Sequence, residues 1–203
     1  MTAAKVVLLR HGITDWNHSG RFQGQADVPL NERGVAQAAA AAQALAGFGI
    51  TKIVCSDLTR AVTTATALAT ACELPFSTDP RLQEINVGSW AGMVTDEVAA
   101  LEPTFREDLA AGRDFRRSPT GETATETGTR VAAAINEWAD GCADSEILAV
   151  VGHGLALRVA MLRLMGLEYV HSRLFAGFGN CHWAVLKPGS EYWRLLSFNQ
   201  AAH

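Results

Sequence analysis

The sequence lacks several features that would assign it at once to a broad functional class. It has no excess of basic residues, because 17 Lys and Arg are outnumbered by 21 Asp and Glu. The resulting net charge of -4 provides no general attraction to nucleic acid or to an anionic membrane, and we expect neither as a partner. A Walker or dinucleotide-binding glycine signature is also missing, so we expect no nucleotide cofactor. Any anion-binding site must therefore be local.

Cysteines and long hydrophobic segments are scarce. The four cysteines, Cys55, Cys72, Cys142 and Cys181, are widely spaced and form no CxxC pair, so we expect reduced thiols rather than disulfides. Near the N-terminus, only the apolar residues 6–9 precede Arg10, which is too few for a membrane span or a signal-peptide core. We therefore expect a cytoplasmic protein.

The hydrophobic pattern is typical of an α/β protein. Strands and helices alternate in the first seventy residues, which favours right-handed crossovers and a mostly parallel sheet covered by helices on both faces. We predict a three-layer α/β/α fold in a single domain, 1–203. Strands are predicted at 6–9, 52–56, 147–151, 181–186 and 192–198, and helices at 37–45, 58–72, 122–140 and 155–165. The last two strands could form a hairpin.

The segment from about 88 to 121 shows no regular period, because residues such as Pro103 and Pro119 interrupt it. We predict an insertion or lid over the site. The segment contains three arginines that could meet a second acidic group on a substrate, although a charge run more often forms a solvated face: Arg113, Arg116 and Arg117. Just beyond it, Glu122 could lie near the site, but Thr123 and Glu126 fit a capping box, which we favour.

Two histidines follow apolar strands in matching contexts. Residues 6–9 lead into Arg10-His11-Gly12, and residues 147–151 lead into Gly152-His153-Gly154. Ligands of open α/β sheets bind beyond the carboxyl ends of the strands, so both histidines are expected at one crevice. Either one alone would be read as a structural residue, but the repeated context favours a site.

Arg60 follows the second predicted strand and falls in the first turn of the next helix. A helix N-terminus carries partial positive charge, so a cation there requires either solvent or an anion. Because Arg10 also ends a strand, we expect the two guanidiniums to face one crevice and bind a phosphoryl group. His153 would add a side-chain donor, and Gly154 would add backbone N–H groups at a helix start.

Four ordered motifs resemble those of the histidine phosphatase superfamily, also called phosphoglycerate mutase-like. They are Leu9–Asn17, Arg21–Leu30, Ser56–Ala61 and Gly152–Gly154, and segment 81–92 matches the family segment that carries a catalytic acid. The resemblance covers nearly the whole chain and implies the family's fold.

This resemblance implies that His11 attacks phosphorus and forms a phosphohistidine. Attack requires a neutral imidazole whose other nitrogen is held as a donor, commonly by a backbone carbonyl. Glu84 is the implied acid, since a carboxyl group beside a bound phosphate keeps its proton more readily, and it would afterwards activate water. Further residues are implied to bind the phosphate oxygens, without a metal: Arg10, Asn17, Gln23, Arg60, His153 and Gly154.

The leading hypothesis is a phosphatase that hydrolyses a small phosphate monoester. A phosphoglycerate mutase is the alternative, but mutases follow the acid with an Arg-His-Tyr-Gly type of segment, whereas here Glu84 precedes Ile85-Asn86-Val87-Gly88. A noncatalytic phospho-ligand module and a metal-dependent hydrolase with His11 and His153 as ligands are further alternatives.

The substrate is expected to be a sugar phosphate or a phosphoglycerate. Segment 177–183 is similar to actinobacterial members that dephosphorylate glucosyl-3-phosphoglycerate. Broad specificity and a homodimer are both compatible with the sequence.

Overall fold

The computed structural model describes residues 2–202, which form a six-stranded sheet with helices on both faces. The strand order is β3-β2-β4-β1-β5-β6, and the pairs β3–β2, β2–β4 and β4–β1 are parallel, while β1–β5 and β5–β6 are antiparallel. The sheet is thus mostly parallel, and its last two strands form the expected hairpin. The strands are β1 (Lys5–Arg10), β2 (Lys52–Cys55), β3 (Phe76–Thr78), β4 (Ile147–Gly152), β5 (Trp183–Lys187) and β6 (Arg194–Gln200).

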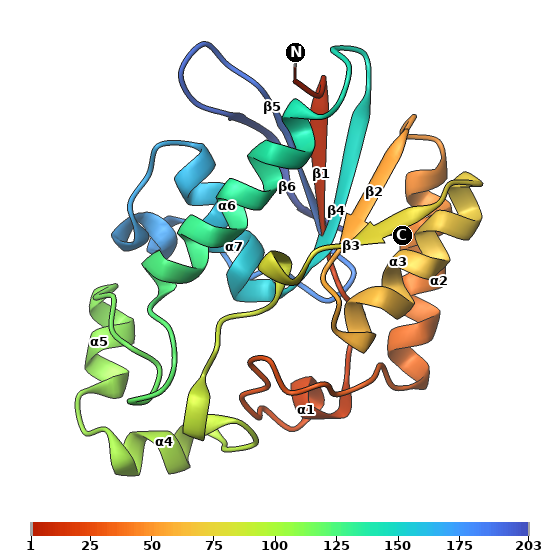
Figure 1. Cartoon of the computed structure of the whole chain (residues 1–203). Coiled ribbons are helices and arrows are strands. Elements are labelled where there is room, and N and C mark those ends of the chain that lie inside the picture. The colour runs from red at the N-terminus through yellow and green to blue at the C-terminus, as the bar shows by residue number, and fades with distance from the viewer. Residues whose placement is uncertain (1, 203) are drawn as a thin grey trace.

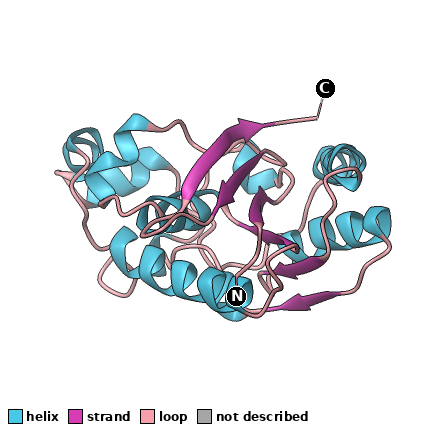
Figure 2. Ribbon diagram, turned by 90° about the horizontal axis from the view of Figure 1, so that it is seen from above, coloured by secondary structure: helices cyan, strands magenta, loops and turns pink. Residues whose placement is uncertain are grey.

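Helices α2 and α3 cover one face of the sheet, and α6 and α7 cover the other (Figures 1 and 2). The three-layer α/β/α architecture is therefore confirmed. The α-helices are α1 (Asp15–His18), α2 (Glu32–Ala46), α3 (Thr59–Cys72), α4 (Thr95–Leu101), α5 (Phe105–Ala111), α6 (Ala124–Asp140) and α7 (Gly154–Leu164), and the short 3-10 helices are η1 (Pro80–Leu82), η2 (Gly88–Trp90) and η3 (Tyr169–Leu174). Among these described elements, none is both long and apolar enough to cross a membrane.

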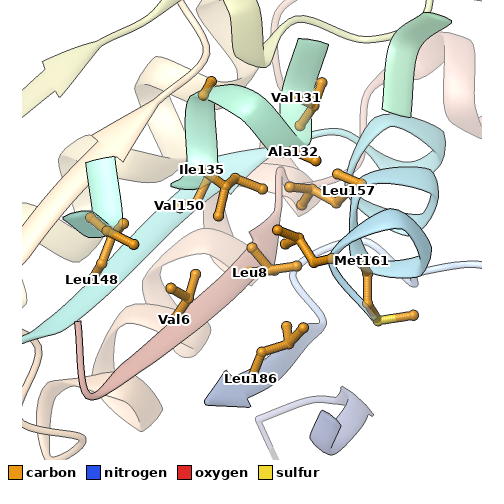
Figure 3. Close-up of a cluster of buried hydrophobic side chains, with 14 of the residues drawn as sticks. Val6, Leu8, Val131, Ala132, Ile135, Leu148, Val150, Leu157, Met161 and Leu186 are labelled. Atoms are coloured by element: carbon orange, nitrogen blue, oxygen red, sulfur yellow. The ribbon is translucent and has the colours of Figure 1, made fainter. Parts of the chain in front are cut away.

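Successive residues of the central strands point to opposite faces and feed two separate cores. Val6 and Leu8 of β1 pack with α6 and α7, as Figure 3 shows, whereas Val7 and Leu9 pack with α2 and α3. A strand that is buried on both faces must be apolar at every position, which explains the uninterrupted run at 6–9.

The structure differs from the sequence expectations at two places. The edge strand β3 was not predicted, because it has only three residues and two of them are exposed. The segment 88–121 contains two seven-residue helices, α4 and α5, where no regular period was recognised. Two turns are too short to reveal a period, and Pro103 separates the helices. Both lie beyond the carboxyl ends of the parallel strands (Figure 1).

The parallel strands end in register at this same edge. Arg10 at the end of β1 pairs with Gly152 at the end of β4, and Cys55 at the end of β2 pairs with Val151. The residues that follow β1, β2 and β4 therefore all emerge at the same edge of the sheet.

All four cysteines are free thiols, and burial raises the pKa of Cys55 and Cys181 to about 12.

Candidate active site

A cavity of about 270 Å³ opens at the carboxyl edge of the sheet and contains most of the predicted site residues. They come from the end of β1 and the segment after it, from the first turn of α3 and from the segment after η1. The predicted residues that line it are Arg10, His11, Asn17, Gln23, Arg60 and Glu84. Of the remaining lining residues, those used below are Ile85, Val87, Phe105, Arg117, Leu155, Arg158 and Tyr169.

The imidazole of His11 is buried, with 2% of the residue's surface exposed, and its orientation is defined by one hydrogen bond. Nδ1 lies 2.6 Å from the carbonyl oxygen of Gly12. A carbonyl oxygen can only accept, so Nδ1 carries the proton and Nε2 keeps its lone pair. Burial, and after it the charges of Arg10 and Arg60, lower the pKa of His11 well below its ordinary value. The ring is therefore neutral, with Nε2 available as a nucleophile.

The guanidinium of Arg10 reaches the cavity past the start of α7. Its Nη1 donates to the carbonyl of Phe178, and its Nε is buried without a hydrogen-bond partner among residues 2–202. A side chain at position 154 would crowd this guanidinium, because a Cβ built on Gly154 would lie 3.1 Å from Nε of Arg10. Glycine at this position thus gives the guanidinium room.

Arg60 is fully buried, so it is not a solvated cation. Its Nη1 donates to Ala26 O at 2.6 Å, its Nη2 to Gly24 O at 2.7 Å, and its Nε to Nδ1 of His153 at 3.2 Å. A guanidinium has five N–H donors, so two are left for a ligand. Its fixed partners are neutral, and the positive charge is not cancelled by them.

His153, which the sequence predicts to donate to phosphate, does not line the cavity in this structure. The ring is fully buried, its Nδ1 accepts from Arg60, and its Nε2 lies 2.8 Å from Oγ of Ser56. Both ring nitrogens thus have protein partners. Burial first, and Arg60 second, lower the pKa of His153 well below its ordinary value. In this arrangement His153 orients Arg60, because its Nδ1 accepts the hydrogen bond from Nε of Arg60.

Asn17 and Gln23 present amide groups to the cavity. The Oε1 of Gln23 accepts from Oγ1 of Thr14 at 3.0 Å, and Oδ1 of Asn17 accepts from Nδ2 of Asn180 at 3.2 Å. The acceptor end of each side chain is thereby occupied. Both residues can turn their NH₂ groups toward a bound anion.

The carboxylate of Glu84 caps the N-terminus of α7. It accepts from the backbone N–H groups of Ala156 at 2.8 Å, Leu155 at 3.1 Å and its own neighbour Ile85 at 2.9 Å. The N–H groups of Leu155 and Ala156, next to Gly154, are therefore used by Glu84, and the N–H of Gly154 itself is not among them. An acidic group is favoured there by the helix dipole. This contact places the carboxylate at the cavity wall, near Arg10 and Arg60.

The wall of the cavity carries two more guanidiniums, those of Arg117 and Arg158. Arg117 is buried, with 4% of its surface exposed, and its Nη2 lies 3.2 Å from the hydroxyl of Tyr169. The expectation of a solvated face is thus wrong for Arg117, although it holds for Arg113 and Arg116, whose exposed side chains form ion pairs.

Arg158 was not recognised in the sequence. Its Nε is buried without a partner in the part of the chain that the structure describes. The sequence feature that could have identified Arg158 as a site residue is its position three residues after Leu155, which places both residues on one face of α7.

The donor groups do not assemble a metal site. Among residues 2–202, no three His, Cys, Asp or Glu side chains are grouped so that they could hold a metal ion. The proposed ligand pair of the metal-dependent alternative, His11 and His153, has ring centroids 5.2 Å apart, but both nitrogens of His153 have protein partners.

Comparisons with known proteins agree with this geometry. The chain is 40% identical over 177 residues, 87% of its length and 81% of the relative's, to a probable phosphoglycerate mutase of Yersinia pestis. Among solved structures, a mycobacterial glucosyl-3-phosphoglycerate phosphatase matches with a TM-score of 0.89 and 33% identity, covering 98% of this chain and all of that one. A phosphoserine phosphatase of Entamoeba histolytica matches with a TM-score of 0.86 and 26% identity, covering 97% of each chain.

The family resemblance of the motifs is confirmed by a model of the whole family. The description of that family is histidine phosphatase superfamily (branch 1), and its model matches residues 6–201. The match includes the motifs that carry Arg10, His11, Arg60 and His153, as well as the Glu84 segment. This chain belongs to the histidine phosphatase superfamily.

Proposed function

We propose that this protein is a phosphatase that hydrolyses a small phosphate monoester through a phosphohistidine on His11. The observation that carries the proposal is a neutral imidazole with a free Nε2 that shares one cavity with the guanidiniums of Arg10 and Arg60 and the carboxyl group of Glu84. A nucleophile, charge stabilisation and a proton donor are the parts that stepwise phosphoryl transfer requires.

In the first step, Nε2 of His11 attacks phosphorus and forms the N–P bond while the P–O bond to the leaving group breaks. The imidazole gains positive charge, which strengthens its Nδ1–H hydrogen bond to Gly12. Arg10, Arg60 and the amides of Asn17 and Gln23 bind the phosphoryl oxygens. Glu84 acts as the general acid and donates a proton to the leaving alkoxide.

In the second step, water attacks the phosphohistidine. The Glu84 carboxylate takes a proton from that water, the new P–O bond forms and the N–P bond breaks. Inorganic phosphate leaves, and Glu84 is again protonated while His11 returns to its neutral form. Each atom and proton is thereby accounted for without a cofactor.

Hydrolysis is favoured over mutase action by the residues that follow the acid. Ile85 and Val87 contribute apolar surface to the cavity next to Glu84. Because relatives are named probable phosphoglycerate mutases, the two activities should be compared directly on 3-phosphoglycerate. Phosphate release that exceeds bisphosphate-stimulated isomerisation supports the proposal, and the reverse ratio assigns the protein as a mutase.

The substrate that fits best carries a second anionic group, such as the carboxylate of a phosphoglycerate. Arg117 and Arg158 supply two further guanidiniums to the cavity wall, and Phe105 supplies apolar surface to it. Guanidinium groups match carboxylate and phosphate geometry. Glucosyl-3-phosphoglycerate, the substrate named for a mycobacterial structural relative, and phosphoserine, named for an amoebal one, both have such a carboxylate.

The covalent intermediate provides the test. Brief reaction with a radiolabelled substrate followed by denaturation should leave one acid-labile, base-stable phosphate per chain. His11→Ala should abolish both the label and turnover, while Arg113→Gln, on an exposed arginine outside the cavity, should retain both. Turnover without any trapped phosphoenzyme, or label retained in His11→Ala, would contradict the mechanism.

A further inference from the structure

The ion pair of Glu122 and Arg130, which lies outside the cavity, forms hydrogen bonds with the backbone on both sides of Glu84. Arg130 of α6 binds Glu122 through two parallel hydrogen bonds, Nε to Oε1 and Nη2 to Oε2, each 2.8 Å long. Both side chains are largely shielded, with 23% and 22% of their side-chain surfaces exposed. Neither residue lines the cavity. The pair is electrically neutral as a unit, so it adds little net charge to the site.

The remaining donors of Arg130 bind the main chain that leads to Glu84. Nη1 donates to the carbonyls of Arg81 at 2.9 Å and Gln83 at 2.7 Å, and Nη2 donates to the carbonyl of Glu84 itself at 2.9 Å. One guanidinium thus holds three carbonyls within four residues. The planar, rigid guanidinium holds several acceptors in a fixed geometry, which a lysine ammonium on its flexible stem cannot reproduce.

Glu122 binds the main chain on the other side of Glu84. Its Oε2 accepts from the backbone N–H of Asn86 at 2.8 Å, and its own N–H donates to the carbonyl of Asn86, also at 2.8 Å. Burial opposes ionisation of Glu122, but the hydrogen bonds from Arg130 and Asn86 outweigh it and lower the pKa of this carboxyl group. The acceptor is therefore charged at neutral pH.

The Glu122–Arg130 pair, called the clamp below, connects the main chain of Glu84 to the helix pair whose α7 is also bound by the Glu84 carboxylate. Arg130 lies on α6, the Glu84 carboxylate caps α7, and α6 and α7 pack together over one core. The backbone of Glu84 is held by α6, and its side chain is held by α7. A proton donor requires this control, because a displacement of about 1 Å can cost about 100-fold in rate.

We propose that the Glu122–Arg130 pair is a positioning device for proton donation by Glu84, holding its main chain from both sides so that the carboxyl group meets the leaving oxygen. This inference rests on the proposed function, in which Glu84 is the acid. It assigns a role to Glu122 beyond the helix start at Thr123, whose capping box with Glu126 is also present.

Leaving-group dependence separates positioning from simple stabilisation. An aryl phosphate needs little protonation of its leaving oxygen, whereas an alkyl phosphate such as glycerol phosphate needs much. Arg130→Lys keeps the charge but loses the multiple contacts, and Glu122→Gln keeps the shape but loses the charge. Each is expected to lower kcat on the alkyl ester about 10-fold or more and on the aryl ester by less than about 3-fold. Arg113→Lys is the matched control and should change neither.

The double variant shows through which residue the pair acts. If the clamp works through Glu84, Arg130→Lys should cause no further loss on the alkyl ester in a Glu84→Gln background. Equal losses on both esters, or additive losses in the double variant, would overturn the inference. So would loss of the folded state in both Arg130→Lys and Glu122→Gln, since the pair would then serve the fold alone.

If Glu84 is not the proton donor, the experiment gives a result that differs from failure of the positioning role alone. In that case Glu84→Gln alone would reduce turnover of the two esters equally. If Glu84→Gln is selective for the alkyl ester but Arg130→Lys is not, the proton donor stands and the positioning role fails.

Discussion

The cations of the cavity are bound mainly by neutral groups. Arg10 donates to a backbone carbonyl, and Arg60 donates to two carbonyls and an imidazole. Glu84 is the carboxylate that shares their cavity. A protein with an overall charge of -4 thus concentrates positive charge at one buried place. Burial first, and this charge second, lower the pKa of His11 and preserve its nucleophilic form.

At the residue scale, Arg117 should report on the second anionic group of the substrate. Arg117→Gln removes a buried charge from the cavity wall. A lost hydrogen bond to a charged group costs about 1.5–3 kcal/mol, or roughly 10-fold to 100-fold in binding. KM for 3-phosphoglycerate is expected to rise by about this factor, while kcat/KM for an aryl phosphate without a carboxylate should change little. Arg113→Gln provides the comparison, and an equal effect of Arg117→Gln on both substrates would remove Arg117 from this role.

At the element scale, the loop that carries His11 is packed directly on the first turn of α2. A Cβ built on Gly34 would lie 2.1 Å from the carbonyl oxygen of Ile13, and one on Gly12 would lie 2.4 Å from the carbonyl oxygen of Gly34. The two backbones therefore approach too closely for any side chain. This contact fixes the path of the chain immediately after His11.

Gly34→Ala is expected to destabilise the protein even though alanine is the better helix former. Helix propensity favours Ala by about 1 kcal/mol, but forced overpacking costs about 1–3 kcal/mol, and we expect the upper end of this range because the atom in the way is backbone. Urea unfolding should show a lower midpoint. Gly47→Ala is the control, since its added Cβ would meet nothing within 4 Å in residues 2–202 and should leave the midpoint unchanged or slightly higher. Equal midpoints for the two variants would show that the loop can move.

Element prediction succeeded where burial imposes a pattern. β1, β2 and β4 are buried on both faces and therefore appear as apolar runs, and α3 carries an apolar stripe at helical spacing. β3 lies at the sheet edge with exposed residues and so has no such pattern. Helices α4 and α5 pack through a small satellite cluster around Trp90, which no local period reveals.

At the scale of the whole molecule, stability should fall as the solution becomes acidic. The folded state keeps His11 and His153 neutral because burial lowers their pKa values well below normal, whereas the unfolded chain protonates them near pH 6.5. Below that pH the unfolded state binds more protons, so the free energy of unfolding decreases by up to about 1.4 kcal/mol per pH unit for each histidine.

Denaturant unfolding at pH 7.5, 6.5 and 5.5 in phosphate-free buffer measures this slope. His11→Asn should reduce the slope of the free energy of unfolding against pH by up to about 1.4 kcal/mol per pH unit, because one histidine no longer contributes to it. A free energy of unfolding that is constant or rises toward pH 5.5 would contradict neutral burial of the two rings.

The sequence by itself determined which residues gather at the site. Apolar runs and strand–helix alternation specify a parallel sheet, so the residues that end or follow three strands, among them Arg10, His11 and Arg60, reach one edge. Only the tertiary structure decided which donors are left for a ligand. Ser56 and Arg60 form hydrogen bonds with the two ring nitrogens of His153. Glu84 accepts from backbone N–H groups at the N-terminus of α7, and Arg117 is buried beside Tyr169. Hydrogen-bond partners depend on distances between segments far apart in the chain, and those distances exist only once the layers have packed.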